Sequence, residues 1–99
     1  MKEDFFKEHG IDLPSIEQAD ASENPKAVAH FTNGNWNWYV IGGKPLDNGD
    51  YYLYVLVDGY DRELGMATLK QIESVGAVLD TEWQEVGVFD IFEDFDLRI

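Results

Sequence analysis

The apolar positions of this 99-residue chain concentrate in three short runs in its middle part. The runs at residues 26–32, 36–41 and 51–58 are rich in β-branched and aromatic residues, which favour extended backbone. An Asn-Gly-Asn turn at residues 33–35 is typical of a tight hairpin, and the loop at residues 42–50 is too short to hold a crossover helix. We therefore expect a three-stranded antiparallel meander.

The residues before these runs indicate a short helix and an irregular connection. Residues 3–8 (EDFFKE) place two phenylalanines among acids that suit the first turn of a helix, and Gly10 ends the pattern. Residues 11–25 contain few apolar residues and several turn formers. They predict a connection with one helical turn at residues 15–18.

The residues after the third run indicate a turn, a helix and further extended chain. Residues 59–65 (GYDRELG) predict the turn. Thr68 and Gln71 then have the spacing of a capping box, and apolar residues recur every third position, which predicts a short helix through Ser74. Residues 77–89 suggest one more extended segment or two short ones.

Together these elements predict one acidic α+β domain that spans residues 1–99. It consists of the three-stranded antiparallel meander, short helices at the N-terminus and after the third strand, and an acidic C-terminal segment. The third run carries apolar residues on both faces, so both sides of the sheet should be partly covered. We expect the helices on one side, and the side with Tyr52 and Tyr54 either under the tail or against a partner.

The net charge of the chain limits its partners. Twenty Asp and Glu residues against seven Lys and Arg residues give a charge of -13, which disfavours direct binding to nucleic acid or to an anionic membrane. A charged partner is therefore expected to be basic. The chain has no apolar run of membrane-spanning length and starts without the apolar core of a secretion signal, which predicts a cytoplasmic protein.

The residues that catalysis or metal binding requires are scarce. There is no cysteine, and His9 and His30 lack the spacing of a zinc site, so each is interpreted as structural. Residues 42–44 (Gly-Gly-Lys) precede a proline instead of the hydroxyl of a phosphate-binding loop, and residues 58–63 lack the acid spacing of a calcium loop. The aromatic residues at 36–39 are interpreted as core, with a ligand pocket as the alternative. We expect a non-enzymatic protein without metal or cofactor.

Acidic residues gather near the C-terminus. Residues 80–96 contain seven acids and no basic residue, with aromatic residues between them. Carboxylates on a rigid surface can occupy the Lys and Arg sites that otherwise neutralise a nucleic-acid backbone. The alternative is a solvated acidic tail that only keeps the protein soluble. We predict that the partner-binding residues are Glu82, Trp83, Glu85, Asp90, Phe92, Glu93, Asp94 and Asp96.

Several short motifs follow one another between residues 26 and 76. They are His30-Phe31, Trp-Asn-Trp-Tyr-Val at residues 36–40, Gly49-Asp50, Val57-Asp58-Gly59, Glu63-Leu64-Gly65 and LKQIESV at residues 69–75. Their order resembles that of a domain family of unknown function found on phages, plasmids and other mobile elements. This chain departs from the family's pattern after Gly65, where Met-Ala-Thr replaces an aromatic residue, Ser and Leu. The resemblance implies a mobile-element context and brings no catalytic residues.

The charge and the resemblance together favour one functional hypothesis. We expect a phage or mobile-element inhibitor of a host nucleic-acid-binding defence protein, of the anti-CRISPR or anti-restriction type. It would mimic nucleic acid and bind a basic channel, such as that of a CRISPR effector or a restriction enzyme. The alternative is a structural or regulatory interaction module that self-associates as a homodimer through the aromatic face around Tyr52 and Tyr54.

Overall fold

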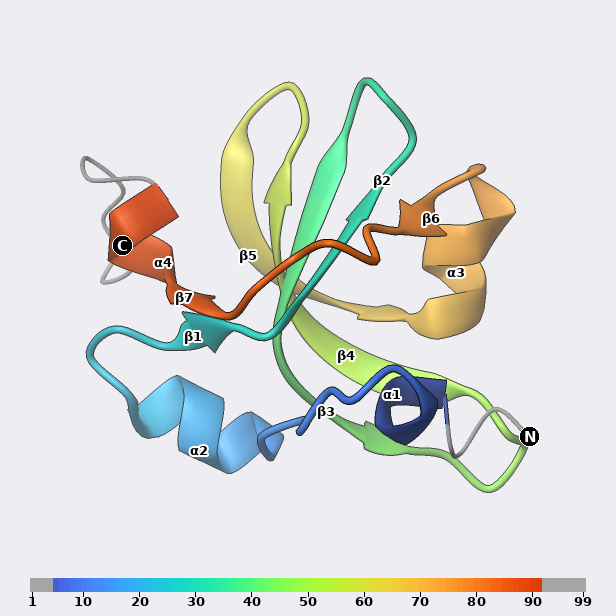
Figure 1. Ribbon diagram of the computed structural model, residues 1–99, viewed down its shortest axis with the longest axis horizontal. Coiled ribbons are helices and arrows are strands. Elements are labelled where there is room, and N and C mark those ends of the chain that lie inside the picture. Colours follow the sequence, from blue (N-terminus) through green and yellow to red (C-terminus); the bar gives the residue numbers. More distant parts are fainter. Residues whose placement is uncertain (1–4, 92–99) are drawn as a thin grey trace.

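The computed structural model describes residues 5–91 of the chain (Figure 1). Within this range the chain forms four short helices and seven strands, which pair into two antiparallel sheets. In chain order the elements are α1 (Phe5–Glu8), α2 (Ile16–Ala21), β1 (Lys26–Ala27), β2 (Ala29–Thr32), β3 (Asn37–Pro45), β4 (Tyr51–Asp58), β5 (Arg62–Thr68), α3 (Leu69–Ser74), β6 (Val78–Leu79), β7 (Val86–Gly87) and α4 (Val88–Ile91).

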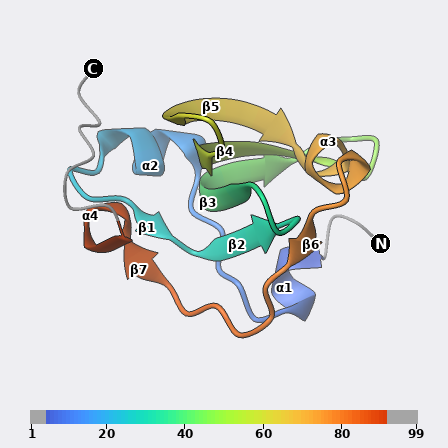
Figure 2. The same ribbon diagram turned by 90° about the horizontal axis from the view of Figure 1, so that it is seen from above.

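The predicted three-stranded meander is wrong because the sheet is larger. The main sheet has five strands in the order β5-β4-β3-β2-β6, and β1 and β7 form a separate two-stranded sheet. Figure 2 shows β5 at one rim, followed by β4, β3 and β2. The apolar runs correspond to the central strands. β5 escaped prediction because its sequence is mixed. The two short extended segments predicted within residues 77–89 are β6 and β7, but residues 88 and 89 begin the helix α4 instead of extending the strand.

The turn predicted at residues 59–65 covers only residues 59–61. From Arg62 onward the chain forms β5, which pairs with β4 over all seven of its residues without a register shift. The sequence of β5, RELGMAT, mixes charged, small and apolar residues and has little strand propensity of its own. Its conformation is therefore decided by the hydrogen bonds that the edge of β4 offers.

The run at residues 26–32, predicted as one strand, is divided between the two sheets. Its first two residues pair with β7, whereas its last four pair with β3 and, in part, with β6. Val28 lies between the two parts, and its amide donates a hydrogen bond to the Val40 carbonyl at 2.8 Å. This division joins the middle of the chain to its C-terminal part.

Side chains pack on both faces of the main sheet, so the prediction that the helices share one side is wrong. On one face, Phe6 of α1 and Leu69 and Ile72 of α3 join side chains of β2, β3 and β4. On the other face, Ala19 of α2 and Val88 of α4 join a second cluster. A fully buried side chain of the size of Val, Leu, Ile or Phe contributes about 1.5–3 kcal/mol to folding. Both clusters therefore stabilise the sheet.

A bulge in β3 brings α2 close to the sheet. The register between β3 and β4 shifts by one residue between Val40 and Gly42. Beyond the shift, the amide of Gly43 donates to the Pro14 carbonyl at 2.9 Å. A Cβ atom at Gly42 would lie 2.9 Å from the carbonyl oxygen of Ser15. Glycine therefore lets the chain before α2 pass directly over the strand.

Capping boxes begin α2 and α3. Ser15 and Gln18 accept hydrogen bonds from each other's backbone amides, and Thr68 and Gln71 do the same. The box at Thr68 confirms the predicted helix through Ser74, and the single turn predicted near Ser15 proves to be the six-residue α2. Each such cap contributes about 1 kcal/mol. No helix within residues 5–91 is long and apolar enough to cross a membrane.

Candidate partner-binding surface

Four of the eight predicted partner-binding residues lie within the described part of the chain, and four lie outside it. Glu82, Trp83, Glu85 and Asp90 belong to residues 77–91, here named the C-terminal segment. The other four predicted residues, Phe92, Glu93, Asp94 and Asp96, lie outside the described residues. The first four therefore indicate how the acidic stretch is attached to the fold.

The C-terminal segment is bonded to the body of the protein along its length. β6 pairs with β2, and the Asp80 amide donates to the His30 carbonyl at 2.8 Å. Further on, β7 pairs with β1, and the Val88 amide donates to the Pro25 carbonyl at 2.9 Å. The Val88 side chain is fully buried. As far as residue 91, the acidic stretch is thus an integral part of the fold.

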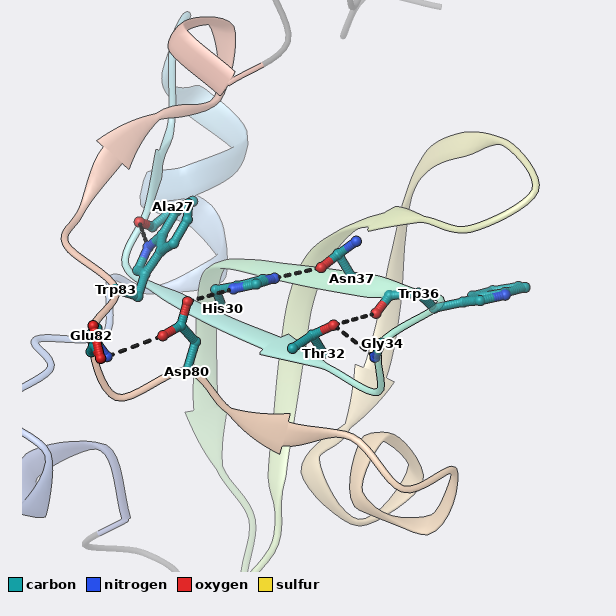
Figure 3. Close-up of polar contacts among 9 residues, drawn as sticks. All are labelled: Ala27, His30, Thr32, Gly34, Trp36, Asn37, Asp80, Glu82 and Trp83. Carbon is teal, nitrogen blue, oxygen red and sulfur yellow. Dashed lines mark hydrogen bonds and ion pairs between the residues drawn. The ribbon is translucent and has the colours of Figure 1, made fainter.

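Trp83 attaches the middle of this segment. Its indole Nε1 donates a hydrogen bond to the Ala27 carbonyl at 2.9 Å (Figure 3). The centroid of its ring lies 5.1 Å from that of His30 and 5.5 Å from that of Tyr39. Packing and hydrogen bonding of this kind stabilise a fold. Trp83 therefore positions the neighbouring acids, and its direct contact with a partner stays a prediction.

His30 is engaged at both ring nitrogens. Its Nδ1 lies 3.0 Å from Oδ2 of Asp80, and its Nε2 lies 2.7 Å from Oδ1 of Asn37 (Figure 3). The ring also stacks on Tyr39, with centroids 4.8 Å apart and planes inclined by 12°. Both partners are acceptor oxygens, and neither is a hydroxyl that the ring could activate as a nucleophile. This geometry agrees with the structural interpretation of His30.

The carboxylate of Asp80 is held by two donors. Besides His30, the backbone amide of Glu82 donates to Oδ1 of Asp80 at 3.1 Å (Figure 3). The hydrogen bond from His30, followed by the one from the Glu82 amide, lowers the pKa of Asp80, while burial opposes this shift. Asp80 is therefore charged at neutral pH, and that charge is engaged within the fold.

Three other acids of the segment are exposed. Glu82 lies on the loop between β6 and β7, and no side chain within residues 5–91 pairs with its carboxylate. The Oε1 atom of Glu85 lies 3.3 Å from Nζ of Lys26, but both side chains are more than half exposed, so the pair contributes little. Asp90 is exposed on α4. These carboxylates remain accessible to a partner.

Further acids come from α2, near the part of the C-terminal segment that forms β7 and α4 (Figures 1 and 2). Glu17, Asp20 and Glu23 are exposed in or just after this helix, which lies beside β1 and near α4 in Figures 1 and 2. A hollow of about 350 Å³ separates α2 from the β1–β7 pair, and Gln18 and Glu85 both line it. Sequence reasoning missed these acids because they are remote in the chain from residues 80–96.

We name the exposed acids in or just after α2, together with those of the C-terminal segment, the acidic surface. Basic side chains are few here, and Lys26 is the one that lines the hollow within the described residues. A surface with one sign of charge attracts a partner of the opposite sign. The acidic surface consists of Glu17, Asp20, Glu23, Glu82, Glu85 and Asp90.

The aromatic face around Tyr52 and Tyr54 is only partly open. The Tyr54 hydroxyl donates to Oδ1 of Asp20 at 3.3 Å. Burial, followed by the charge of Asp20, raises the pKa of Tyr54. Tyr52 pairs with Thr68 at the end of β5, near the rim of the sheet, and is 37% exposed. Any self-association through this face is therefore confined to the rim.

Two motif residues have roles in folding. Asp50 is 4% exposed, and its Oδ1 accepts hydrogen bonds from the amides of Tyr51 at 2.8 Å and Lys70 at 3.1 Å. It thereby joins the start of β4 to α3. Gly59 lies against the Trp36 ring, so closely that an added Cβ would come within 2.5 Å of it. Packing and turn geometry thus account for both residues.

The described part of the chain has hollows of different sizes but no group of metal-binding side chains. Residues 5–91 contain no group of three or more His, Asp and Glu side chains that could hold a metal ion. The hollow beside Asp80 and Trp83 measures about 50 Å³, well below the roughly 300 Å³ of a typical ligand pocket, whereas the hollow beside α2 reaches that size.

Comparison of the chain with protein-family models, with curated proteins and with solved structures yields no match. The family resemblance inferred from the motifs between residues 26 and 76 therefore stays a prediction.

Proposed function

We propose that this protein is an inhibitor of the phage or mobile-element type that acts in the cytoplasm of the infected or carrier cell. It binds the basic nucleic-acid channel of a host defence protein, such as a CRISPR effector or a restriction enzyme. The acidic surface takes the place of nucleic-acid phosphates in that channel. No catalytic step and no cofactor are involved.

One observation carries the proposal. The exposed acids Glu82, Glu85 and Asp90 stand on backbone that Trp83 and two strand pairings hold in place. Ordering a mobile segment on binding costs conformational entropy, so acids that stand on ordered backbone bind at a lower cost than those of a mobile tail. Carboxylates carried on this ordered backbone can therefore match the Lys and Arg side chains of a channel better than those of a mobile tail.

The charge of the whole chain supports the same function. A net charge of -13 generates a field that accelerates encounter with a basic protein and repels nucleic acid. The extra acids of α2 widen the acidic surface beyond the C-terminal segment. Binding of this kind depends on salt because added ions screen the charges of both partners.

Binding to purified CRISPR effectors and restriction endonucleases tests the proposal. The dissociation constant is measured at increasing salt concentration, with and without the nucleic acid that each enzyme binds. We expect binding that weakens with salt and excludes the nucleic acid. Binding that is indifferent to salt, or a complex that holds both ligands at once, would contradict mimicry. Failure to bind any enzyme of the panel would contradict the proposed class of partner.

A further inference from the structure

The main sheet leaves one long strand edge open. β5 is its outermost strand, and within residues 5–91 no strand pairs with the outer side of β5 (Figure 2). The opposite rim is formed by β6, which has only two residues. An edge of seven residues presents a row of backbone donors and acceptors to any further strand.

β5 lacks the features by which proteins usually protect such an edge. Its ladder with β4 has no bulge, and its sequence has no proline. Charged residues occupy only its first two positions, so its centre, residues 64–67, is uncharged. Met66 is 39% exposed on the same face as Tyr52 of the neighbouring strand. An edge of this kind is suited to pairing with another strand.

The structure of the single chain does not explain Gly65, at the middle of β5. Its φ angle is not positive, and an added Cβ atom would meet nothing within 4 Å. Glycine inside a strand costs about 0.5–1 kcal/mol relative to alanine. Such a glycine often marks a place where another backbone approaches closely.

We propose that β5 pairs with β5 of a second copy of this chain, antiparallel, across a twofold axis at Gly65. Only this register overlaps all seven residues. It sets the apolar Leu64 of each copy against Met66 of the other, on the face that also carries Tyr52. It opposes each charged residue to an uncharged one, Arg62 to Thr68 and Glu63 to Ala67. The pairing joins two five-stranded sheets edge to edge.

The net charge predicts how this dimer responds to salt. Two copies that each carry -13 repel one another, and this repulsion weakens as the Debye length falls from about 30 Å at 0.01 M to about 8 Å at 0.15 M salt. Salt should therefore favour the dimer, whereas it weakens binding to a basic channel. The edge and the acidic surface share no residue, so failure of one proposal is distinguishable from failure of the other.

A single engineered thiol tests the register, because the chain has no cysteine. Opposed Cα atoms in an antiparallel pair lie about 4.5–5.5 Å apart, within the range of a disulfide. G65C should therefore form a disulfide-linked dimer under mild oxidation. E63C should not form this disulfide. In the proposed register, residue 63 of one copy lies four residues along the strand from residue 63 of the other, a distance of roughly 13 Å. V78C is the control, because Val78 lies on the opposite rim and is 65% exposed. Its rate of disulfide formation is that expected from random collisions between two molecules.

Sedimentation of variants tests the interface without cross-linking. M66K places a charge at the centre of the open edge and should weaken dimerisation about tenfold or more. V78K makes the same charge change on β6 and should leave dimerisation unchanged, and circular dichroism verifies that both variants are folded.

The proposal is overturned if the wild-type chain stays monomeric at high protein concentration in about 1 M salt, where the Debye length is about 3 Å. It is also overturned if G65C cross-links no faster than V78C. A dimer that survives M66K but is disrupted by V78K would place the interface at β6 and would likewise contradict pairing through β5.

Discussion

The Nδ1 atom of His30 lies 3.0 Å from Oδ2 of Asp80, fifty residues further along the chain. This contact joins β2 to the loop that carries Glu82, and the Glu82 amide donates to the same carboxylate. The Asp80 side chain is 34% exposed, so solvent weakens the interaction. The pair is therefore a modest but specific attachment of the acidic loop.

Replacing Asp80 by asparagine should destabilise the protein at neutral pH by about 1 kcal/mol. The pKa of Asp80 is lower in the folded chain than its ordinary value of 3.8, so the ionised carboxylate favours folding. That contribution is complete above the ordinary pKa and is lost as the pH falls through the lower, folded pKa. Urea denaturation of the wild type and D80N should give free energies of unfolding that differ at pH 7 and converge in acid.

The control for this experiment is D47N, which changes an exposed carboxylate on the turn between β3 and β4. Its free energy of unfolding at pH 7 should equal that of the wild type, because an exposed charge contributes little to folding. A difference between the wild type and D80N that is constant with pH would show that the hydrogen bond from His30 does not stabilise the ionised form.

Substitutions of Trp83 should separate its hydrogen bond from its packing. W83F keeps a ring and loses the donor to Ala27, at a cost of about 1 kcal/mol in the free energy of unfolding. W83A also removes the contacts with His30 and Tyr39 and should cost roughly 2–3 kcal/mol, less than full burial would give because Trp83 is partly exposed. Chemical denaturation measures both losses.

If Trp83 positions the acids, W83A should also weaken binding to the basic partner, although it removes no charge. Titration of the partner at fixed salt, under conditions where W83A stays folded, measures this effect. An unchanged dissociation constant would mean that the acidic surface does not depend on the attachment at Trp83.

Reversing charges on the acidic surface should impair binding without unfolding the protein. E82K/D90K changes two exposed acids and should raise the dissociation constant for a basic channel about tenfold or more, equivalent to about 1.4 kcal/mol. The matched control E8K/D47K makes the same change in net charge on α1 and on the β3–β4 turn, at the other end of the molecule (Figure 1). Equal losses in the two variants would indicate that only total charge matters.

Reversal of Glu93 and Asp94 to lysine extends this test beyond the described residues. We expect loss of inhibition with little change in melting temperature. Unaltered inhibition would confine the binding site to the acidic surface on the described part of the chain.

Two glycines should respond in opposite ways to alanine. In G59A the added methyl group would lie within 2.5 Å of the Trp36 ring and should cost about 1–3 kcal/mol. G65A meets open space and should leave the fold unchanged or stabilise it by up to about 1 kcal/mol, because the unfolded chain loses freedom. Thermal denaturation at low protein concentration, where any dimer dissociates, measures both. Destabilisation of the monomer by G65A would mean that Gly65 is needed within the single chain.

Features that depend on neighbours in the chain were predictable. The capping box of α3 joins Thr68 to Gln71, and the turn after β2 places Gly34 at a φ of 94°. Their signals lie within a few residues of one another, so the sequence pattern contains the whole interaction. The central strands were predicted for a similar reason, since their apolar runs are continuous.

The attachment of the candidate site was not predictable in the same way. The run at residues 80–96 indicated where the acids gather, but not that Trp83 reaches back to Ala27 or that Asp80 meets His30. The residues next to Trp83 and Asp80 in the sequence do not indicate which distant residues these two side chains will contact. The acids of α2 join the same surface only through the packing of that helix on the sheet.

The sequence by itself determined the charge of this protein, the capped starts of α2 and α3 and the approximate positions of its three central strands, because these follow from composition and short-range pattern. Only the tertiary structure decided that residues 62–68 form a fourth long strand, that residues 26–32 divide between two sheets, and that the acidic stretch is held on the fold as far as residue 91. The physical reason is that the backbone of a strand needs a neighbouring strand for its hydrogen bonds, and that neighbour can come from a distant part of the sequence.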